Sequence, residues 1–91
     1  MGRHDLDLIA RRGDLVAFIE VKARRSDRYG RGEEAVGPKK RRVLERVAWS
    51  WMIKYGRAGD QYRFDVLVLS GPGLGAQTLT HLEDAWRPGW R

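Results

Sequence analysis

Two carboxylates and a lysine are spaced so that one hairpin would bring them to the same face of a sheet. Asp7 lies in the segment DLDLIA, and Glu20 and Lys22 lie in the segment FIEVK. Between the two segments, residues 12–15 predict a tight two-residue turn, because their glycine adopts positive φ without steric strain. Counting outward from that turn places Asp7 opposite Glu20, with the two Cβ atoms roughly 4.5–5.5 Å apart. Lys22 lies two residues beyond Glu20 and therefore on the same face.

This arrangement suits a divalent cation that acts on a phosphate. Two facing carboxylates repel each other and destabilise a plain hairpin, whereas Mg²⁺ or Mn²⁺ takes oxygen ligands and removes the repulsion. A lysine beside the metal can orient a water or stabilise charge that develops on a phosphate. The alternative is that Asp7 and Glu20 face solvent and are balanced by Lys22 and nearby arginines. A polar cluster on an apolar face favours a site, and alternation adds three apolar residues to this face: Ile9, Val16 and Phe18.

A basic run is the second feature that indicates a function. Its four residues are Lys39, Lys40, Arg41 and Arg42. They open a predicted helix, where positive charge is unfavourable by roughly 0.3–1 kcal/mol per residue, and a phosphate backbone would reverse that sign. Arg24 and Arg25 add charge in the preceding loop, so we expect these six residues to bind nucleic acid. The alternative is a solvated basic face that aids solubility.

The elements that position these residues form one unit without internal repeats. The predicted strands are residues 6–11, 15–23, 63–69 and 77–82, the last of them a short edge strand. The predicted helix runs from Pro38 to about Tyr55 and stops at Gly56. Within the third strand, we expect Asp65 to pair with an arginine rather than bind a metal. The final segment PGWR is predicted to be a loose tail.

This order predicts an α/β fold with a small mixed sheet and one long crossover helix, because parallel strands need such a connection. Residues 15–21 are apolar on both faces of their strand except at Glu20, so both faces of the sheet need cover. One long helix covers only one face. The other would be shielded by Trp86 and Trp90, or by a second copy of the chain, so we expect a homodimer.

Composition narrows the class of protein. The chain has 91 residues, which predicts a single domain over 1–91, and it has no cysteine to build a disulfide framework or a zinc–thiolate site. A formal net charge of +6 favours a polyanionic partner such as nucleic acid, most simply DNA. No apolar run is long enough to cross a membrane, and the N-terminus lacks a signal-peptide core. We therefore expect a cytoplasmic protein.

Several segments together resemble a known family, the YraN family of predicted nucleases. They are DLDLIA, AFIEVKARRSDRYG, EEAVGPKKRRVLERVA, RFDVLVL and HLEDAW, and they span nearly the whole chain. The resemblance implies a restriction-endonuclease-like fold similar to that of archaeal Holliday junction resolvases. It also implies that Asp7 and Glu20 bind the metal and that Lys22 assists the attacking water. Family members usually begin with a helix, which carries a further glutamate, and a strand. This chain begins almost at the motif, so we expect a core that lacks both.

Two hypotheses about function follow, and a third is weaker. The first is a metal-dependent endonuclease that hydrolyses phosphodiester bonds, with branched DNA as a possible substrate. The second is a non-catalytic nucleic-acid-binding module, or an inactive remnant of a nuclease, that uses the basic helix end and the loop before it. The third is an assembly subunit whose open sheet face docks a partner protein.

Overall fold

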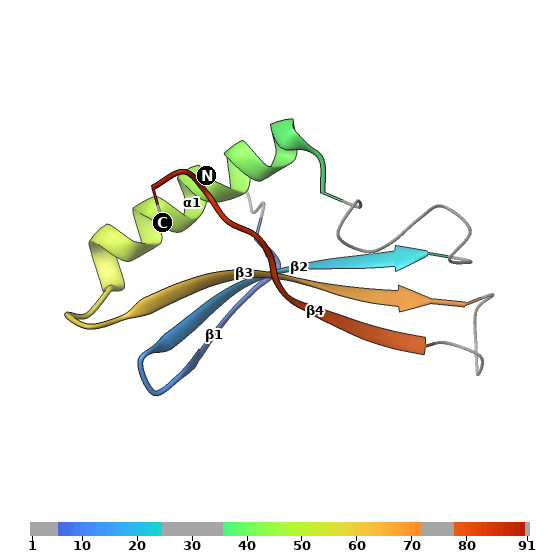
Figure 1. The fold of residues 1–91 in the computed structure, drawn as a ribbon, viewed down its shortest axis with the longest axis horizontal. Coiled ribbons are helices and arrows are strands. Elements are labelled where there is room, and N and C mark those ends of the chain that lie inside the picture. Colours follow the sequence, from blue (N-terminus) through green and yellow to red (C-terminus); the bar gives the residue numbers. More distant parts are fainter. Residues whose placement is uncertain (1–5, 25–35, 72–77, 91) are drawn as a thin grey trace.

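A computed structural model describes residues 6–24, 36–71 and 78–90, which form one sheet and one helix (Figure 1). The elements in chain order are β1 (Leu8–Arg12), β2 (Leu15–Arg24), α1 (Pro38–Tyr55), β3 (Gln61–Ser70) and β4 (Thr78–Trp86). The helix lies along one side of the sheet (Figure 1). Within these residues, no helix has the length and apolar character needed to cross a membrane.

The sheet is mixed, and its strands follow the chain order β1-β2-β3-β4. Strand β2 pairs antiparallel with β1 and parallel with β3, and α1 makes the crossover between the two parallel strands. These pairings confirm the predicted α/β fold with a mixed sheet and one crossover helix. The predicted hairpin register is also confirmed, because Arg12 pairs with Leu15 and Leu8 pairs with Ile19. The turn between them uses Gly13 at a φ of 62°.

The helix begins and ends where the sequence predicted. Pro38 occupies its first turn after Gly37, which caps the helix without a side-chain hydrogen bond. Gly56 ends the helix in an extended conformation, with a φ of −65°, and its N–H donates to the carbonyl of Met52. A Cβ atom on Gly56 would lie 2.5 Å from Met52 O and 2.5 Å from Tyr62 Oη. Glycine is therefore needed at this position for space rather than for a left-handed backbone.

The core lies between α1 and the sheet. Its buried apolar residues are Val16, Phe18, Val36, Leu44, Ala48, Phe64, Val66, Val68 and Trp86. Phe18 lies at the centre, with ring centroids 5.4 Å from Phe64 and 5.7 Å from Trp51. The helix residues in this core are Leu44 and Ala48, which belong to an apolar stripe that recurs at three- and four-residue spacing over residues 43–55, so this stripe is the face of α1 that turns toward the sheet.

The end of the chain corrects two predictions. The segment after β4 turns up beside α1 (Figure 1), where Pro88 is buried and the Trp90 ring contacts Phe64 and Trp49. The prediction that the final segment is a loose tail was therefore wrong. Trp86 stacks on Phe64 at 4.7 Å within the core, so the two tryptophans cover the helix side of the sheet. Their predicted place on the opposite face was wrong because β4 runs on to Trp86 and carries the chain across to the helix.

The sheet face opposite α1 carries two exposed leucines. Leu8 pairs with Ile19 and Leu79 pairs with Leu69, on the strand positions that alternate with the core residues. Ile19 on this face is nevertheless buried. The homodimer that would cover Leu8 and Leu79 stays a prediction.

An ion pair ties the hairpin to the connection between α1 and β3. Both Arg11 guanidinium nitrogens donate to the carboxylate of Asp60, at 2.7 and 2.8 Å. The Arg57 N–H and the Tyr62 hydroxyl donate to the same carboxylate. These hydrogen bonds, that of Arg11 above all, hold the pKa of Asp60 well below its usual range. They fix the edge strand β1, whose neighbouring segment supplies Asp7.

Candidate functional site

The structure brings the three predicted catalytic residues together at one end of the sheet. Glu20 lies on β2 with only 6% of its side chain exposed, and Lys22 Nζ lies 3.5 Å from Glu20 Oε2. Asp7 directly precedes β1, and its Oδ2 accepts a hydrogen bond of 2.9 Å from the Val21 N–H. The ladder between β1 and β2 ends at Leu8, so this side-chain bond continues the pairing by one residue. The solvent-facing alternative was wrong for Glu20, whereas Asp7 is exposed.

Glu20 is an unsatisfied carboxylate inside the protein. Its Oε1 is buried and has no hydrogen-bond partner among the described residues. Burial raises the pKa of Glu20, and the nearby charge of Asp7 raises it further. Lys40 and Lys22 lower the pKa of Glu20, but they compensate only part of this increase. A buried charge whose oxygen lacks a hydrogen-bond partner is unfavourable in a folded protein, so binding of a further positive group at this position would stabilise it.

The helix N-terminus supplies positive potential at the same place. Lys40 lies in the first turn of α1, and its charge acts on Glu20. That turn has no acidic residue and no side-chain cap, so its positive end is not neutralised locally. The sequence predicted Lys40 as a nucleic-acid contact but did not link it to Glu20. The crossover topology could have predicted this proximity, because α1 begins at the end of the sheet where β2 ends.

Asp7 and Glu20 fit a magnesium or manganese ion with few protein ligands. Across residues 6–24, 36–71 and 78–90, no group of three or more His, Asp or Glu side chains could hold a metal. Two carboxylates are nevertheless enough for Mg²⁺, which keeps several waters and commonly takes its other ligands from substrate phosphates. The open Oε1 of Glu20 is the observation that favours this fit. The donors are oxygen atoms, which disfavours a zinc-type site.

The residues predicted to bind nucleic acid have different surroundings. Lys39 and Arg42 are exposed at the start of α1. The Arg41 guanidinium lies over the Trp86 ring at 5.3 Å, and its Nε donates to the carbonyl of Val36. Arg24 is the last residue of β2, and Arg25 lies outside the described residues. The nucleic-acid role of all these residues, Lys40 included, stays a prediction.

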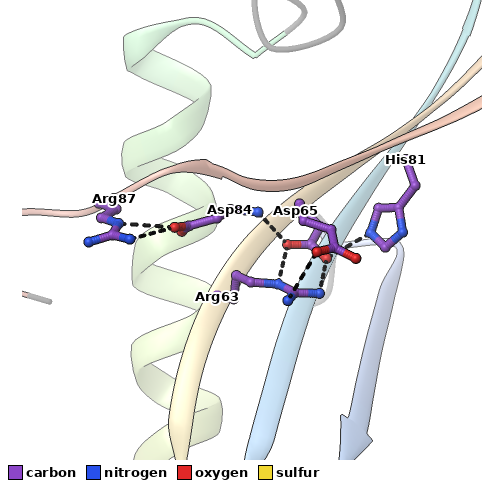
Figure 2. Close-up of polar contacts among 6 residues, drawn as sticks. Arg63, Asp65, His81, Asp84 and Arg87 are labelled. Carbon is purple, nitrogen blue, oxygen red and sulfur yellow. Dashed lines mark hydrogen bonds and ion pairs between the residues drawn. The ribbon is translucent and has the colours of Figure 1, made fainter.

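A second charged cluster surrounds Asp65 on β3 and is a structural one (Figure 2). Asp65 is fully buried, and Arg63 donates to both of its oxygens, at 2.8 and 2.9 Å. The Asp84 N–H donates at 2.9 Å, and His81 Nε2 lies 2.8 Å from Asp65 Oδ2. Burial raises the pKa of Asp65, but these hydrogen bonds outweigh it and lower the pKa overall. The predicted pairing of Asp65 with an arginine is confirmed.

Comparison with known proteins gives a consistent result. The model of the uncharacterised protein family UPF0102 matches residues 1–69. A UPF0102 protein of Frankia casuarinae is 37% identical over 82 residues, which cover 90% of this chain and 70% of the relative. A UPF0102 protein of Rhodococcus jostii is 40% identical over 83 residues, which cover 90% and 70%. One of Pelotomaculum thermopropionicum is 34% identical, with 90% and 69% covered.

Proposed function

The chain belongs to the UPF0102 family, also known as YraN, and from that premise we propose that it is a metal-dependent endonuclease. The reaction is hydrolysis of phosphodiester bonds in DNA, and the resemblance to Holliday junction resolvases suggests a branched substrate. The observation that carries the proposal is the buried carboxylate of Glu20, whose Oε1 has no partner among the described residues. A protein retains such a group against its own stability most readily where a ligand completes it.

Each residue of the site has a distinct role in this proposal. Asp7 and Glu20 would hold a Mg²⁺ or Mn²⁺ ion. When bound, the ion supplies positive charge to the scissile phosphate and lowers the pKa of a water molecule. The Lys22 ammonium lies beside Glu20 and orients the attacking water while stabilising charge on the phosphate. Lys40 and the uncapped first turn of α1 attract the phosphate from the helix side.

Cleavage assays with matched variants test this proposal. The purified protein is incubated with labelled linear, single-stranded and four-way-junction DNA in Mg²⁺, Mn²⁺ or EDTA. The expected result is metal-dependent cleavage by the wild type and by Glu83→Gln, a matched change at an exposed glutamate that pairs with Arg63 rather than with a residue of the site. Glu20→Gln and Lys22→Ala are expected to abolish cleavage while binding remains. Equal cleavage by the wild type and both site variants would refute the proposal.

A second candidate is a nucleic-acid-binding module without catalysis, or an inactive remnant of a nuclease. The observation that favours it is that the described residues supply two carboxylates at the site rather than three. It predicts binding that weakens as salt rises, because phosphate contacts release counterions. Salt-sensitive binding without cleavage in any metal would select this candidate over the endonuclease.

Partners and location follow from the same sequence features. We propose a homodimer in which the face that carries Leu8 and Leu79 is covered by a second copy. Sedimentation at micromolar concentration tests this, and a monomeric mass would contradict it. An unrelated partner protein on this face is the outcome that would support the weaker assembly-subunit hypothesis. The cytoplasmic location expected from the sequence stays a prediction.

A further inference from the structure

A groove on the outer side of α1 combines exposed aromatic rings with basic side chains. Its volume is about 600 Å³, and its lining residues are Arg42, Glu45, Arg46, Trp49, Ser50 and Trp90. Trp49 is 48% exposed and Trp90 is 39% exposed, which is unusual for two large apolar side chains in contact. The two rings meet edge to face, with centroids 5.2 Å apart. Neither the candidate site nor the core uses the outward faces of these rings.

Two arginines and a tryptophan lie in one line along α1. Arg42, Arg46 and Trp49 are four and three residues apart, so they lie on one face of the helix. Both arginines are exposed, and Lys39 continues the line toward the first turn. Glu45 is the acidic residue of the groove, and its Oε2 accepts a hydrogen bond of 2.9 Å from Trp86 Nε1. The exposed edge of the groove is therefore basic, and it complements a phosphate backbone.

We propose that this groove binds an unpaired segment of nucleic acid, with a base stacked on the Trp49 ring beside Trp90. Arg42 and Arg46 contact the phosphates on either side of that base. Stacking platforms of this kind combine aromatic side chains with a basic track and accept any base sequence. A buried apolar peptide side chain would not need the two arginines, which is why nucleic acid is the occupant that the charges favour.

The groove also has a defined relation to the candidate site. Nine residues separate Lys40, beside Glu20, from Trp49, which corresponds to about 14 Å along the helix axis. A stacked strand advances about 3.4 Å per nucleotide, so the groove lies about four nucleotides from the site. This inference rests on the proposed function in one respect, which is that the ligand is nucleic acid. It narrows the substrate to DNA that has an unpaired region close to the cleaved bond.

Binding in EDTA tests the groove apart from catalysis. The probes are a fluorescent 12-nucleotide oligothymidylate and a blunt duplex of about the same length, titrated with protein. Trp49→Ala is expected to weaken single-strand binding about 5- to 150-fold, the range for loss of one stacked base. Trp49→Phe keeps a ring and is expected to retain most of the affinity. Tyr55→Ala, which removes another exposed aromatic ring of α1 outside the groove lining, is the matched control and is expected to bind like the wild type.

The two arginines provide an independent arm of the same experiment. Arg42→Gln together with Arg46→Gln is expected to weaken binding and flatten its salt dependence, whereas Arg12→Gln on the hairpin is expected to do neither. Circular dichroism confirms that each variant is folded.

Three outcomes would overturn the groove assignment. Equal binding of the oligothymidylate by the wild type, Trp49→Ala and the double arginine variant would refute it and leave the endonuclease proposal intact. No binding of either probe by the wild type would refute the groove assignment, and the cleavage assay with four-way-junction DNA and metal would then decide the endonuclease proposal separately. Self-association that depends on Trp49, without nucleic-acid binding, would assign the groove to a second copy of the chain. Conversely, Trp49-dependent binding without any cleavage would support the groove and refute the endonuclease alone.

Discussion

Glu20→Gln is expected to stabilise the protein when no metal is present. Glu20 is buried, its Oε1 lacks a partner among the described residues, and the charge of Asp7 lies nearby. Glutamine has nearly the same shape, carries no charge and is not repelled by the Asp7 carboxylate. The change therefore removes an unfavourable buried charge without leaving a cavity.

The size of the effect follows from the groups involved. An unpaired buried polar group costs about 1–3 kcal/mol. The glutamine amide recovers part of this penalty, but it loses the attraction of Glu20 to Lys22 and Lys40. We therefore expect a net gain of about 1 kcal/mol in the free energy of unfolding at neutral pH. For a domain of this length, that gain raises Tm by about 4–8 °C.

The pH dependence gives the sharper test. The pKa of Glu20 is raised above the unfolded value of about 4.3, so the ionised form is penalised only in the folded protein. The penalty is complete above the folded pKa and absent below about pH 4, where both states are protonated. The advantage of Glu20→Gln should therefore be largest at neutral pH and vanish near pH 4. Thermal unfolding in EDTA across this range measures it, with Glu83→Gln as the control. A Glu20→Gln variant that is less stable than the wild type at neutral pH would refute the reasoning.

Three further predictions concern the frame and the basic run. Asp65→Asn should lower the free energy of unfolding by about 3–5 kcal/mol, because it removes the buried negative charge that pairs with Arg63 and leaves only the exposed Glu83, 3.7 Å away, as an acidic partner. The pKa of Asp65 is lowered in the folded protein, so the stability lost in this variant should be largest above about pH 4 and should disappear as the pH falls through the folded pKa. Urea denaturation measures the free energy of unfolding of both proteins. A loss of less than about 1 kcal/mol at neutral pH would contradict the prediction. Gly56→Ala should cost about 1–3 kcal/mol in the same assay, whereas Gly89→Ala, whose Cβ meets open space, should stay within about 0.5 kcal/mol. Replacing residues 39–42 by glutamine should reduce the salt slope of DNA binding by about 0.7–0.9 for each phosphate that the run neutralises; an unchanged slope in fluorescence anisotropy would exclude the run from the interface.

Local chemistry made much of the fold predictable. The glycine at position 13 fixed the hairpin register, and through it the approach of Asp7 to Glu20. Pro38 and Gly56 marked the ends of the helix, the first through its fixed φ and the second through the frequent use of glycine after a helix, although the structure uses this glycine for space. In each case one residue type has a strong preference that neighbouring residues do not override.

Tertiary contacts decided the features that sequence patterns did not reveal. Strand β4 runs past the predicted end at Leu82 to Trp86. A register shift and a positive φ at Asp84 break the alternation of its side chains, so the sequence pattern did not reveal its last residues. The tail is held because Trp90 finds Phe64 and Trp49, which are distant in sequence. The exposed position of Trp49 had a sequence signal, since it lies off the apolar stripe of its helix, on the line of Arg42 and Arg46.

Metal binding by Asp7 and Glu20 is the central claim, and manganese titration followed by electron paramagnetic resonance tests it most directly. The titration is made with and without an oligonucleotide, for the wild type, Asp7→Asn, Glu20→Gln and the control Glu83→Gln. We predict saturable Mn²⁺ binding by the wild type and the control, strengthened by the oligonucleotide and lost in both site variants. Mn²⁺ binding of equal strength in all four proteins, or binding by none of them under either condition, would contradict it.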